Sequence, residues 1–256
     1  MDVASGALFA LSDLPFIWKQ TTWEGKGIIF CLLSFSIVAW STMAQKAMQM
    51  RQAKKLNQLF EREFKRQKHV LDVYDRRVSV PECPLFMVYH EGCQTLDARL
   101  KPPGEHHRKP YASMKVMEHV KRSLERAVSE ESLKLESGLI LLAIAVSGAP
   151  FLGLLGTVWG VMSAFSLVAL AGKADLLVMA PGVAAALATT VAGLLVAIPS
   201  MFGYNWLVHN LRVLTVELDN FAQELISRME TEYLRDDEDE QRDEPLPGVS
   251  PASRKE

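Results

Sequence analysis

Three long stretches without a charged residue or a histidine constrain this chain more than any other feature. They are Gly27–Gln45, Gly138–Gly172 and Leu176–Val208, and they are 19, 35 and 33 residues long. A helix that crosses a bilayer needs about 20 apolar residues, whereas apolar runs of about 10–14 are more typical of a buried soluble helix. The stretches exclude a soluble globular enzyme, an all-β protein and a disordered chain. They predict an all-α polytopic membrane protein with three transmembrane helices that extend into a helical bundle.

Charges beside the first stretch predict the orientation of the chain. Residues 1–26 carry a net charge of −1, whereas Lys46, Arg51, Lys54 and Lys55 follow the stretch closely. An excess of Lys and Arg marks the cytoplasmic side of a membrane helix. A cleaved signal peptide would instead begin with a basic segment. We therefore expect an N-terminal segment 1–26 outside, a retained helix 27–45, and a cytoplasmic loop 46–137.

The second and third stretches predict a hairpin of two membrane helices, 138–172 and 176–208. Only residues 173–175 separate them, so the tip is a short turn on the outer side. Each stretch is longer than a bilayer requires, which favours helices that tilt or project from the membrane. A cytoplasmic helix 209–235 and a disordered acidic tail 236–256 follow. The tail contains seven acids among the nine residues from Asp236 to Glu244.

Outside the spans, apolar residues recur at helical spacing between proline-rich breaks. We expect the first helix to continue to Tyr74, a short helix Leu85–Leu100, and a longer helix Tyr111–Ser137 that runs into the second span. The apolar stripes suit either the core of a bundle or contacts between subunits. Their members are Leu56, Leu59, Phe60 and Phe64; Val116, Val120, Leu124, Val128 and Leu135; and Leu211, Leu214, Leu218, Phe221 and Leu225.

No pattern of residues outside the membrane predicts catalysis. The chain has no phosphate-binding loop, no nucleophile elbow and no paired-carboxylate site, so we expect neither an enzyme nor a bound cofactor, and no nucleic acid partner. Cys83, His90 and Cys93 do not have the spacing of a zinc site. His106 and His107 lie in a predicted solvated loop. We expect no metal.

Small residues crowd the predicted hairpin and indicate close contact between helices. Glycine and alanine let helix backbones approach each other where lipid removes the hydrophobic driving force. We therefore expect these helices to contact protein on most sides, in an oligomer or with a partner helix, besides membrane lipid. The small residues include Gly148, Ala149, Gly153, Gly156, Gly160 and Ala164, and then Gly182, Ala184, Ala185, Ala186, Ala188, Ala192 and Gly193.

Hydroxyl groups lie among these small residues, with Thr157 in one helix and Thr189 and Thr190 in the other. A membrane threonine often does no more than bond a carbonyl of its own helix. Alternatively, Thr157 and Thr190 fall at similar depth and could line a polar path, because a hydroxyl both donates and accepts. No span contains an ionisable side chain, although proton pathways usually carry one. A proton path here therefore requires a carboxylate from a partner.

Two runs of sequence carry a family resemblance. SGAPFLGLLGTVWGVMSAF (Ser147–Phe165) and APGVAAALATTVAGLLVAIPSMFGYN (Ala180–Asn205) together resemble the paired signature of the MotA/TolQ/ExbB proton channel family, in its TolQ and ExbB branch. The resemblance implies a proton channel subunit of the cytoplasmic (inner) membrane, with a periplasmic N-terminus and a cytoplasmic C-terminus. It also implies a pentamer around ExbD/TolR-like single-span helices that supply a membrane aspartate, and a TonB- or TolA-like transducer.

The resemblance also implies roles for individual residues. Thr157 and Thr190 match the pore threonines of the family, and Thr189 adds a neighbouring hydroxyl. Ala185 stands where the family usually has a glutamate, so the accessory role of that glutamate is lost, filled by the partner or taken by Thr189. Expected helix-packing and pore-lining residues are Gly153, Gly156, Gly160, Pro181, Gly182, Ala185, Ala186 and Gly193.

Two alternatives remain open at this point. The chain could be a non-conducting membrane scaffold for a single-span partner, because small residues alone would serve that role. It could also be a divergent flagellar-type stator subunit, although that branch typically has four spans and this chain has three predicted ones. The sequence does not determine whether outer-membrane transport or envelope maintenance is energised.

Overall fold

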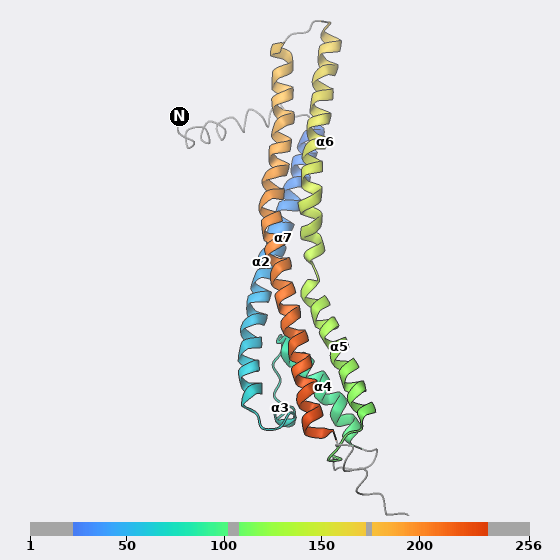
Figure 1. The fold of residues 1–256 in the computed structure, drawn as a ribbon. Helices are drawn as coiled ribbons and strands as arrows, with labels where there is room; N and C mark the ends of the chain where they lie inside the picture. Colours follow the sequence, from blue (N-terminus) through green and yellow to red (C-terminus); the bar gives the residue numbers. More distant parts are fainter. Residues whose placement is uncertain (1–22, 102–107, 173–175, 235–256) are drawn as a thin grey trace, which may run out of the picture. The chain divides into compact units, whose positions relative to one another are not determined.

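The computed structural model describes residues 23–101, 108–172 and 176–234, which are almost entirely helical (Figure 1). This part contains no strand, only an isolated bridge between Ala112 and Leu234. The predicted all-α fold is confirmed. Predictions for residues 1–22, His106, His107, 173–175 and 236–256 fall outside the described residues. The helices are α2 (Trp23–Arg66), α3 (Asp72–Asp75), α4 (Pro84–Leu100), α5 (Met114–Glu136), α6 (Leu139–Ala171) and α7 (Leu176–Tyr233).

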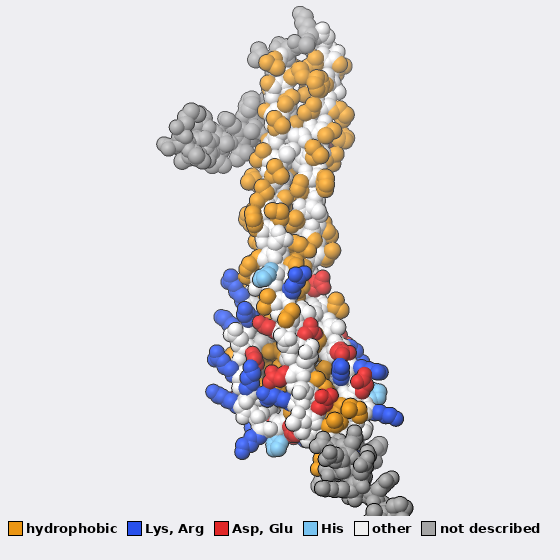
Figure 2. Space-filling model, in the orientation of Figure 1, with side chains coloured by type: hydrophobic (Ala, Val, Ile, Leu, Met, Phe, Trp, Pro, Cys, Tyr) orange, Lys and Arg blue, Asp and Glu red, His pale blue; other side chains and the backbone are white. Residues whose placement is uncertain are grey.

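Three of these helices, α2, α6 and α7, are long and apolar enough to cross a membrane. The chain divides into two compact units, Met1–Arg51 with Glu136–Arg212, and Gln52–Leu135 with Val213–Glu256. We call the first the apolar unit and the second the charged unit. Figure 2 shows hydrophobic side chains over the surface of the apolar unit and charged side chains over the charged unit. The helices α2 and α7 contribute residues to both units.

The helix α2 ends at Arg66, eight residues before the predicted end at Tyr74. Polar groups from other segments bind the backbone that follows. The Val70 N–H donates to Glu232 of α7 at 2.8 Å, and the His69 N–H donates to Asp72 at 3.2 Å. These bonds replace the helical ones, and α3 then forms a short separate helix. Tertiary contacts therefore override a sequence that is locally favourable for a helix.

The helices α5 and α6 are separate, although the sequence predicted one helix running into the second span. Gly138 breaks them with a φ of +83°, a left-handed conformation that glycine adopts without steric cost. The helix α5 also starts later than predicted, at Met114. At the other end of α6, Gly172 takes a φ of +66° and its N–H donates to the Val168 carbonyl at 3.1 Å.

Aromatic side chains form the core of the charged unit. The ring centroids of Phe64 and Phe221 are 5.1 Å apart, and those of Phe60 and Phe86 are 5.6 Å apart, so the cluster joins α2, α4 and α7. Leu124, Leu218 and Leu225 are at most 1% exposed. Of the two uses left open for the apolar stripes, these buried residues show packing within the chain.

One expected member of the α2 stripe lies on the wrong face. Leu59 is 61% exposed, whereas Phe60 and Phe64 are buried. Successive residues on a helix are about 100° apart. The buried face of α2 therefore passes through Ala53, Asn57, Phe60 and Phe64, which are three or four residues apart, and leaves Leu59 beside it.

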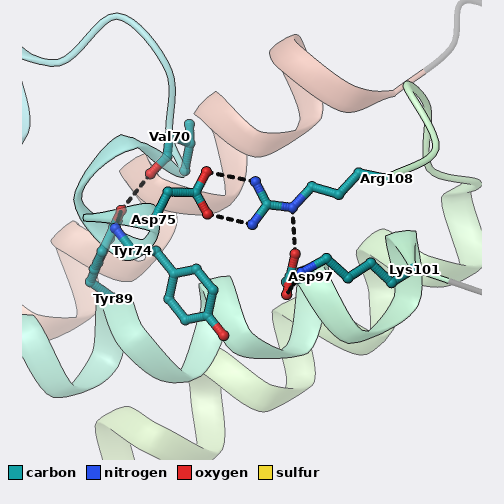
Figure 3. A network of polar contacts seen from close by, with 7 residues as sticks. All are labelled: Val70, Tyr74, Asp75, Tyr89, Asp97, Lys101 and Arg108. Carbon is teal, nitrogen blue, oxygen red and sulfur yellow. Dashed lines mark hydrogen bonds and ion pairs between the residues drawn. The ribbon is translucent and has the colours of Figure 1, made fainter. Parts of the chain in front are cut away.

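Figure 3 shows a polar network that ties the segment around α3 to α4. The Arg108 guanidinium donates to both Asp75 oxygens at 2.5–2.6 Å and through Nε to Asp97 at 2.5 Å. The hydrogen bond from Arg108 holds the pKa of the Asp75 carboxyl below its ordinary value. The Tyr89 hydroxyl accepts from the Tyr74 N–H at 3.1 Å and donates to the Val70 carbonyl at 2.6 Å.

Candidate functional site

The helices α6 and α7 meet along faces made of small residues. The contacting pairs are Ala164 with Gly182, Gly160 with Ala186, Gly156 with Thr189, and Ala149 with Gly193. The α6 number falls as the α7 number rises, so the helices are antiparallel. Neighbouring members of each face are three, four or seven residues apart, which is the spacing of one side of a helix. The sequence predicted a contact of small residues between these helices but could not assign the pairs.

The backbones approach too closely for larger side chains. A Cβ at Gly160 would lie 2.6 Å from that of Ala186, and a Cβ at Gly193 would lie 2.6 Å from the Ala149 carbonyl oxygen. A Cβ at Gly156 would overlap the Thr189 side chain. A Cβ at Gly148, in contrast, would meet nothing within 4 Å. Glycine is therefore required at specific positions rather than throughout the hairpin.

The structure brings the hydroxyls of Thr157 and Thr190 together across the two helices. Their Oγ1 atoms are 3.2 Å apart. Thr157 donates to the Leu154 carbonyl of its own helix at 2.7 Å, and Thr190 donates across to the Gly153 carbonyl at 3.1 Å. Both side chains are half-buried. The pair therefore joins α6 and α7 through polar groups within an otherwise apolar contact.

The two hydroxyls can form more than one set of hydrogen bonds. Two hydroxyls carry two protons, but four acceptor oxygens are available, namely the Leu154 and Gly153 carbonyls and the two hydroxyl oxygens themselves. A bond between Thr157 and Thr190 forms only when one hydroxyl releases its carbonyl. Rotation of either hydroxyl thus exchanges the arrangements while both side chains stay in place.

Thr189 lies deeper than the other two threonines, with 1% of its surface exposed. Its hydroxyl lies 2.6 Å from the Ala186 carbonyl and 3.2 Å from the Gly153 carbonyl. Thr189 and Thr190 therefore share one acceptor on α6. No sequence pattern points to the Gly153 and Leu154 carbonyls as part of the site, because every residue has a carbonyl and only the fold brings these two to the hydroxyls.

The remaining predicted residues lie on α7 near this contact. Ala185 and Ala186 are 4% and 2% exposed, and Gly182 and Pro181 are half-buried. A carboxylate at position 185 would be buried where neither α6 nor α7 offers a basic side chain before His209. Burying an unpaired charge is costly. Alanine is compatible with this burial, whereas a glutamate at this position would need a partner.

No metal site emerges in the part of the chain that the structure describes. No three His, Cys, Asp or Glu side chains lie together there. Burial raises the pKa of the Cys83 and Cys93 thiols, which makes them poor thiolate ligands. The Cys83 thiol lies 3.5 Å from the Asn57 side-chain oxygen. That the chain binds no metal stays a prediction.

Large apolar side chains cover the outside of the hairpin. They leave a hydrophobic surface, visible in Figure 2, that suits lipid or another membrane helix. On α6 they lie away from the glycine face that contacts α7. Examples are Phe151 (71% exposed), Leu154 (54%), Val158 (60%) and Met162 (53%) on α6, and Leu187 (58%) and Val191 (56%) on α7.

Comparison with known proteins places this site within a family. The sequence model described as the MotA/TolQ/ExbB proton channel family matches residues 94–220, which include the three threonines. The chain is 34% identical to the Tol-Pal system protein TolQ of Pseudomonas aeruginosa over 180 residues, 70% of this chain and 75% of that protein. It is 33% identical to TolQ of Haemophilus influenzae over 203 residues, 77% of this chain and 85% of that one.

A biopolymer transport protein is also similar. ExbB of Xanthomonas campestris pv. campestris is 42% identical over 113 residues, which are 44% of this chain and 45% of that protein.

Proposed function

This chain belongs to the MotA/TolQ/ExbB proton channel family, and on that basis we propose that it is a TolQ/ExbB-like proton channel subunit of the inner membrane. It converts proton motive force into mechanical work on a TonB- or TolA-like partner, for outer-membrane transport or envelope maintenance. Each proton that crosses supplies about 2.3 kcal/mol per 100 mV.

One observation carries the proposal, namely the 3.2 Å contact between the Thr157 and Thr190 hydroxyls. The two hydroxyls have fewer protons than acceptors, so rotation of a hydroxyl switches its hydrogen bond from one acceptor to another. A half-buried hydroxyl in apolar surroundings can also hold a water or accept from an arriving acid. These properties suit a relay step in a proton path.

Threonine cannot carry the charge, so the proposal requires a second protein. The stretches 138–172 and 176–208 contain no Asp, Glu, Lys, Arg or His. We propose that a single-span ExbD/TolR-like partner supplies a membrane aspartate, which takes up a proton and passes the threonine pair. Motion of that helix relative to the ring of subunits delivers the work.

The exposed apolar surface supports an assembly of several copies, proposed here as a pentamer around the partner helices. The proposed orientation follows from the basic residues after Gln45, with the N-terminus periplasmic and the C-terminus cytoplasmic. The glycine contacts along α6 and α7 keep Thr157 opposite Thr190. Thr189 supports the pair through the shared Gly153 carbonyl.

Proton flux into liposomes tests the proposal directly. The protein and its single-span partner are reconstituted together, a membrane potential is imposed, and internal pH is followed with a dye. We expect partner-dependent flux that falls at least tenfold in Thr157→Val and in Thr190→Val. Valine keeps the shape of threonine but removes the hydroxyl. Thr157→Ser and Thr190→Ser keep the hydroxyl and retain most of the flux.

Ser166→Ala is a matched control on the same helix. Its hydroxyl donates to the Met162 carbonyl one turn back at 3.0 Å, and no bond to a described side chain of α7 is seen. That variant retains full flux. A stable complex whose flux is unchanged in both valine variants contradicts the path and favours a scaffold. Complex size, measured by gel filtration, separates loss of conduction from loss of assembly.

A further inference from the structure

The last part of α2 exposes a basic stripe. We define this basic stripe as Lys54, Lys55, Arg62, Lys65, Arg66 and Lys68, of which all but Lys68 lie on α2 and all six are exposed. At 100° per residue, the five on the helix fall on one side of it. From Lys54 to Lys68 only Glu61 and Glu63 oppose the six cations, giving a net charge of +4.

Few acids neutralise this stripe within the part of the chain that the structure describes. Lys65 pairs with Glu61 at 2.6 Å, and Glu63 lies 3.9 Å from Arg76. No ion pair with a described acid is seen for the other five cations of the basic stripe. An exposed surface with this excess of one charge favours an anionic partner.

A cavity of about 450 Å³ lies at the end of the basic stripe, between the segment after α2 and the end of α7. Gln67, Lys68 and His69 line one side, and Arg228 and Thr231 line the other. The side-chain nitrogen and oxygen of Gln67 are both buried, and neither has a hydrogen-bond partner among the described residues. Glu232 also lines the cavity, but its carboxylate is bound to His69 and to the Val70 N–H, so the Lys68 side chain favours an occupant with carboxylate groups.

The chain itself contains a segment of the required charge. From Asp236 to Glu244 it has seven acids and Arg242, a net charge of −6. The end of α7 lies next to the basic stripe, because Glu232 accepts the Val70 N–H at 2.8 Å and contacts His69 Nδ1 at 2.9 Å. The acidic segment therefore begins four residues after a direct contact with this end of the stripe.

Chain length allows this segment to cover the whole stripe. Four residues from Glu232 to Asp236 span at most about 14 Å, and nine extended residues span about 30 Å. The helix from Arg66 back to Lys54 is only about 18 Å long. We propose that the acidic segment Asp236–Glu244 docks on the basic stripe of the same copy and that its first residues fill the cavity beside Gln67.

Anionic lipid fits this stripe less well. Lys54 lies nine residues beyond Gln45, the end of the first charge-free stretch, and Arg66 lies 21 residues beyond it. These are about 13 Å and 30 Å along a helix. The field of a charged membrane decays over about 8–10 Å at physiological salt. Most cations of the basic stripe therefore lie too far along the helix for strong attraction to lipid headgroups, whereas the acidic segment is long enough to contact them.

Cross-linking of the full-length protein in neutral-lipid nanodiscs tests the docking. Lys68→Cys is combined with Glu238→Cys and treated with a short bis-maleimide. The matched control combines Lys115→Cys with Glu238→Cys. Lys115 is exposed near Ala112, whose N–H donates to the Tyr233 carbonyl at 2.8 Å. Lys115 is therefore also close to the end of α7 but lies outside the basic stripe.

We expect at least fivefold more intramolecular product from the Lys68 pair than from the Lys115 pair at 50 mM salt. The excess disappears at 1 M salt, where the screening length is about 3 Å, and it also disappears when Arg62→Gln and Arg66→Gln are added. Equal yields from the two pairs, a salt-independent excess, or product only between copies overturns the proposal. Unchanged melting temperatures show that the variants fold. The outcome does not depend on proton flux.

Discussion

The two units of this protein bury opposite kinds of side chain. In the charged unit, Phe64 and Tyr89 are at most 1% exposed and form an aromatic core. In the apolar unit, Gly156 and Ala149 are buried between helices while Phe151 is 71% exposed. Water drives large apolar groups inward in the first unit. Lipid provides no such drive in the second, so close backbone contact between small residues holds the helices together.

The buried polar groups of the two units also differ. The charged unit holds Asp97 at 9% exposure and binds it to Arg108 and Lys101. Among the described residues, the polar bonds between α6 and α7 join hydroxyls and backbone carbonyls. An ion pair near water costs little free energy, whereas a charge inside a membrane costs much more. These buried polar groups thus have partners suited to the surroundings of each unit.

The largest expected effect comes from a side chain placed in the contact between α6 and α7. Gly156→Leu forces the helices apart, because even a Cβ at this position overlaps Thr189. We expect no stable folded protein and no complex of normal size, measured by gel filtration in detergent. Gly148→Leu is the matched control on the same helix, since a Cβ there meets nothing within 4 Å. A complex of normal size from Gly156→Leu would show that the contact tolerates bulk.

The next effect concerns the aromatic core of the charged unit. Phe64→Ala leaves a cavity in the cluster with Phe221 and Tyr89, so we expect a loss of about 3–5 kcal/mol in the free energy of unfolding. Leu59→Ala on the same helix changes it by about 0.5 kcal/mol or less, because Leu59 is 61% exposed. Thermal unfolding of the full chain in detergent measures both. Equal losses would mean that Leu59 is covered in the assembled protein.

The smallest effect is electrostatic and depends on pH. Arg108 lowers the pKa of the Asp75 carboxyl, so ionised Asp75 stabilises the fold above its unfolded pKa of about 3.9, and this contribution disappears as pH falls below that value. Asp75 is half-exposed, so Asp75→Asn costs about 1 kcal/mol or less at pH 7. We expect the difference in melting temperature from wild type to be largest at neutral pH and to shrink as pH falls below about 3.9, through the lowered pKa of Asp75. A difference that does not shrink with acidification contradicts the pairing.

Asp219→Asn is the control for that titration. Asp219 is exposed on α7, and no ion pair with a described residue is seen. Its difference from wild type stays small and constant over the same pH range.

Features that depend on local composition could be predicted from the amino-acid sequence. The long charge-free stretches predicted the number of membrane-spanning helices, because a helix that crosses a bilayer must be long and uncharged over one continuous segment. Glycine and alanine at helical spacing indicated the close contact, and Thr157 and Thr190 were recognised as its polar members. None of these inferences required knowledge of which residues from distant segments meet.

Which residues from distant segments contact each other became known only from the fold. Glu232 holds the backbone near Val70, so α2 ends at Arg66 although the sequence favours a longer helix. The left-handed Gly138 separates α5 from α6. The Gly153 carbonyl joins the threonine site because the α6–α7 contact brings it to the hydroxyls of α7. A pattern of residue types specifies faces and periods, whereas register and hydrogen-bond partners depend on contacts between segments far apart in the chain.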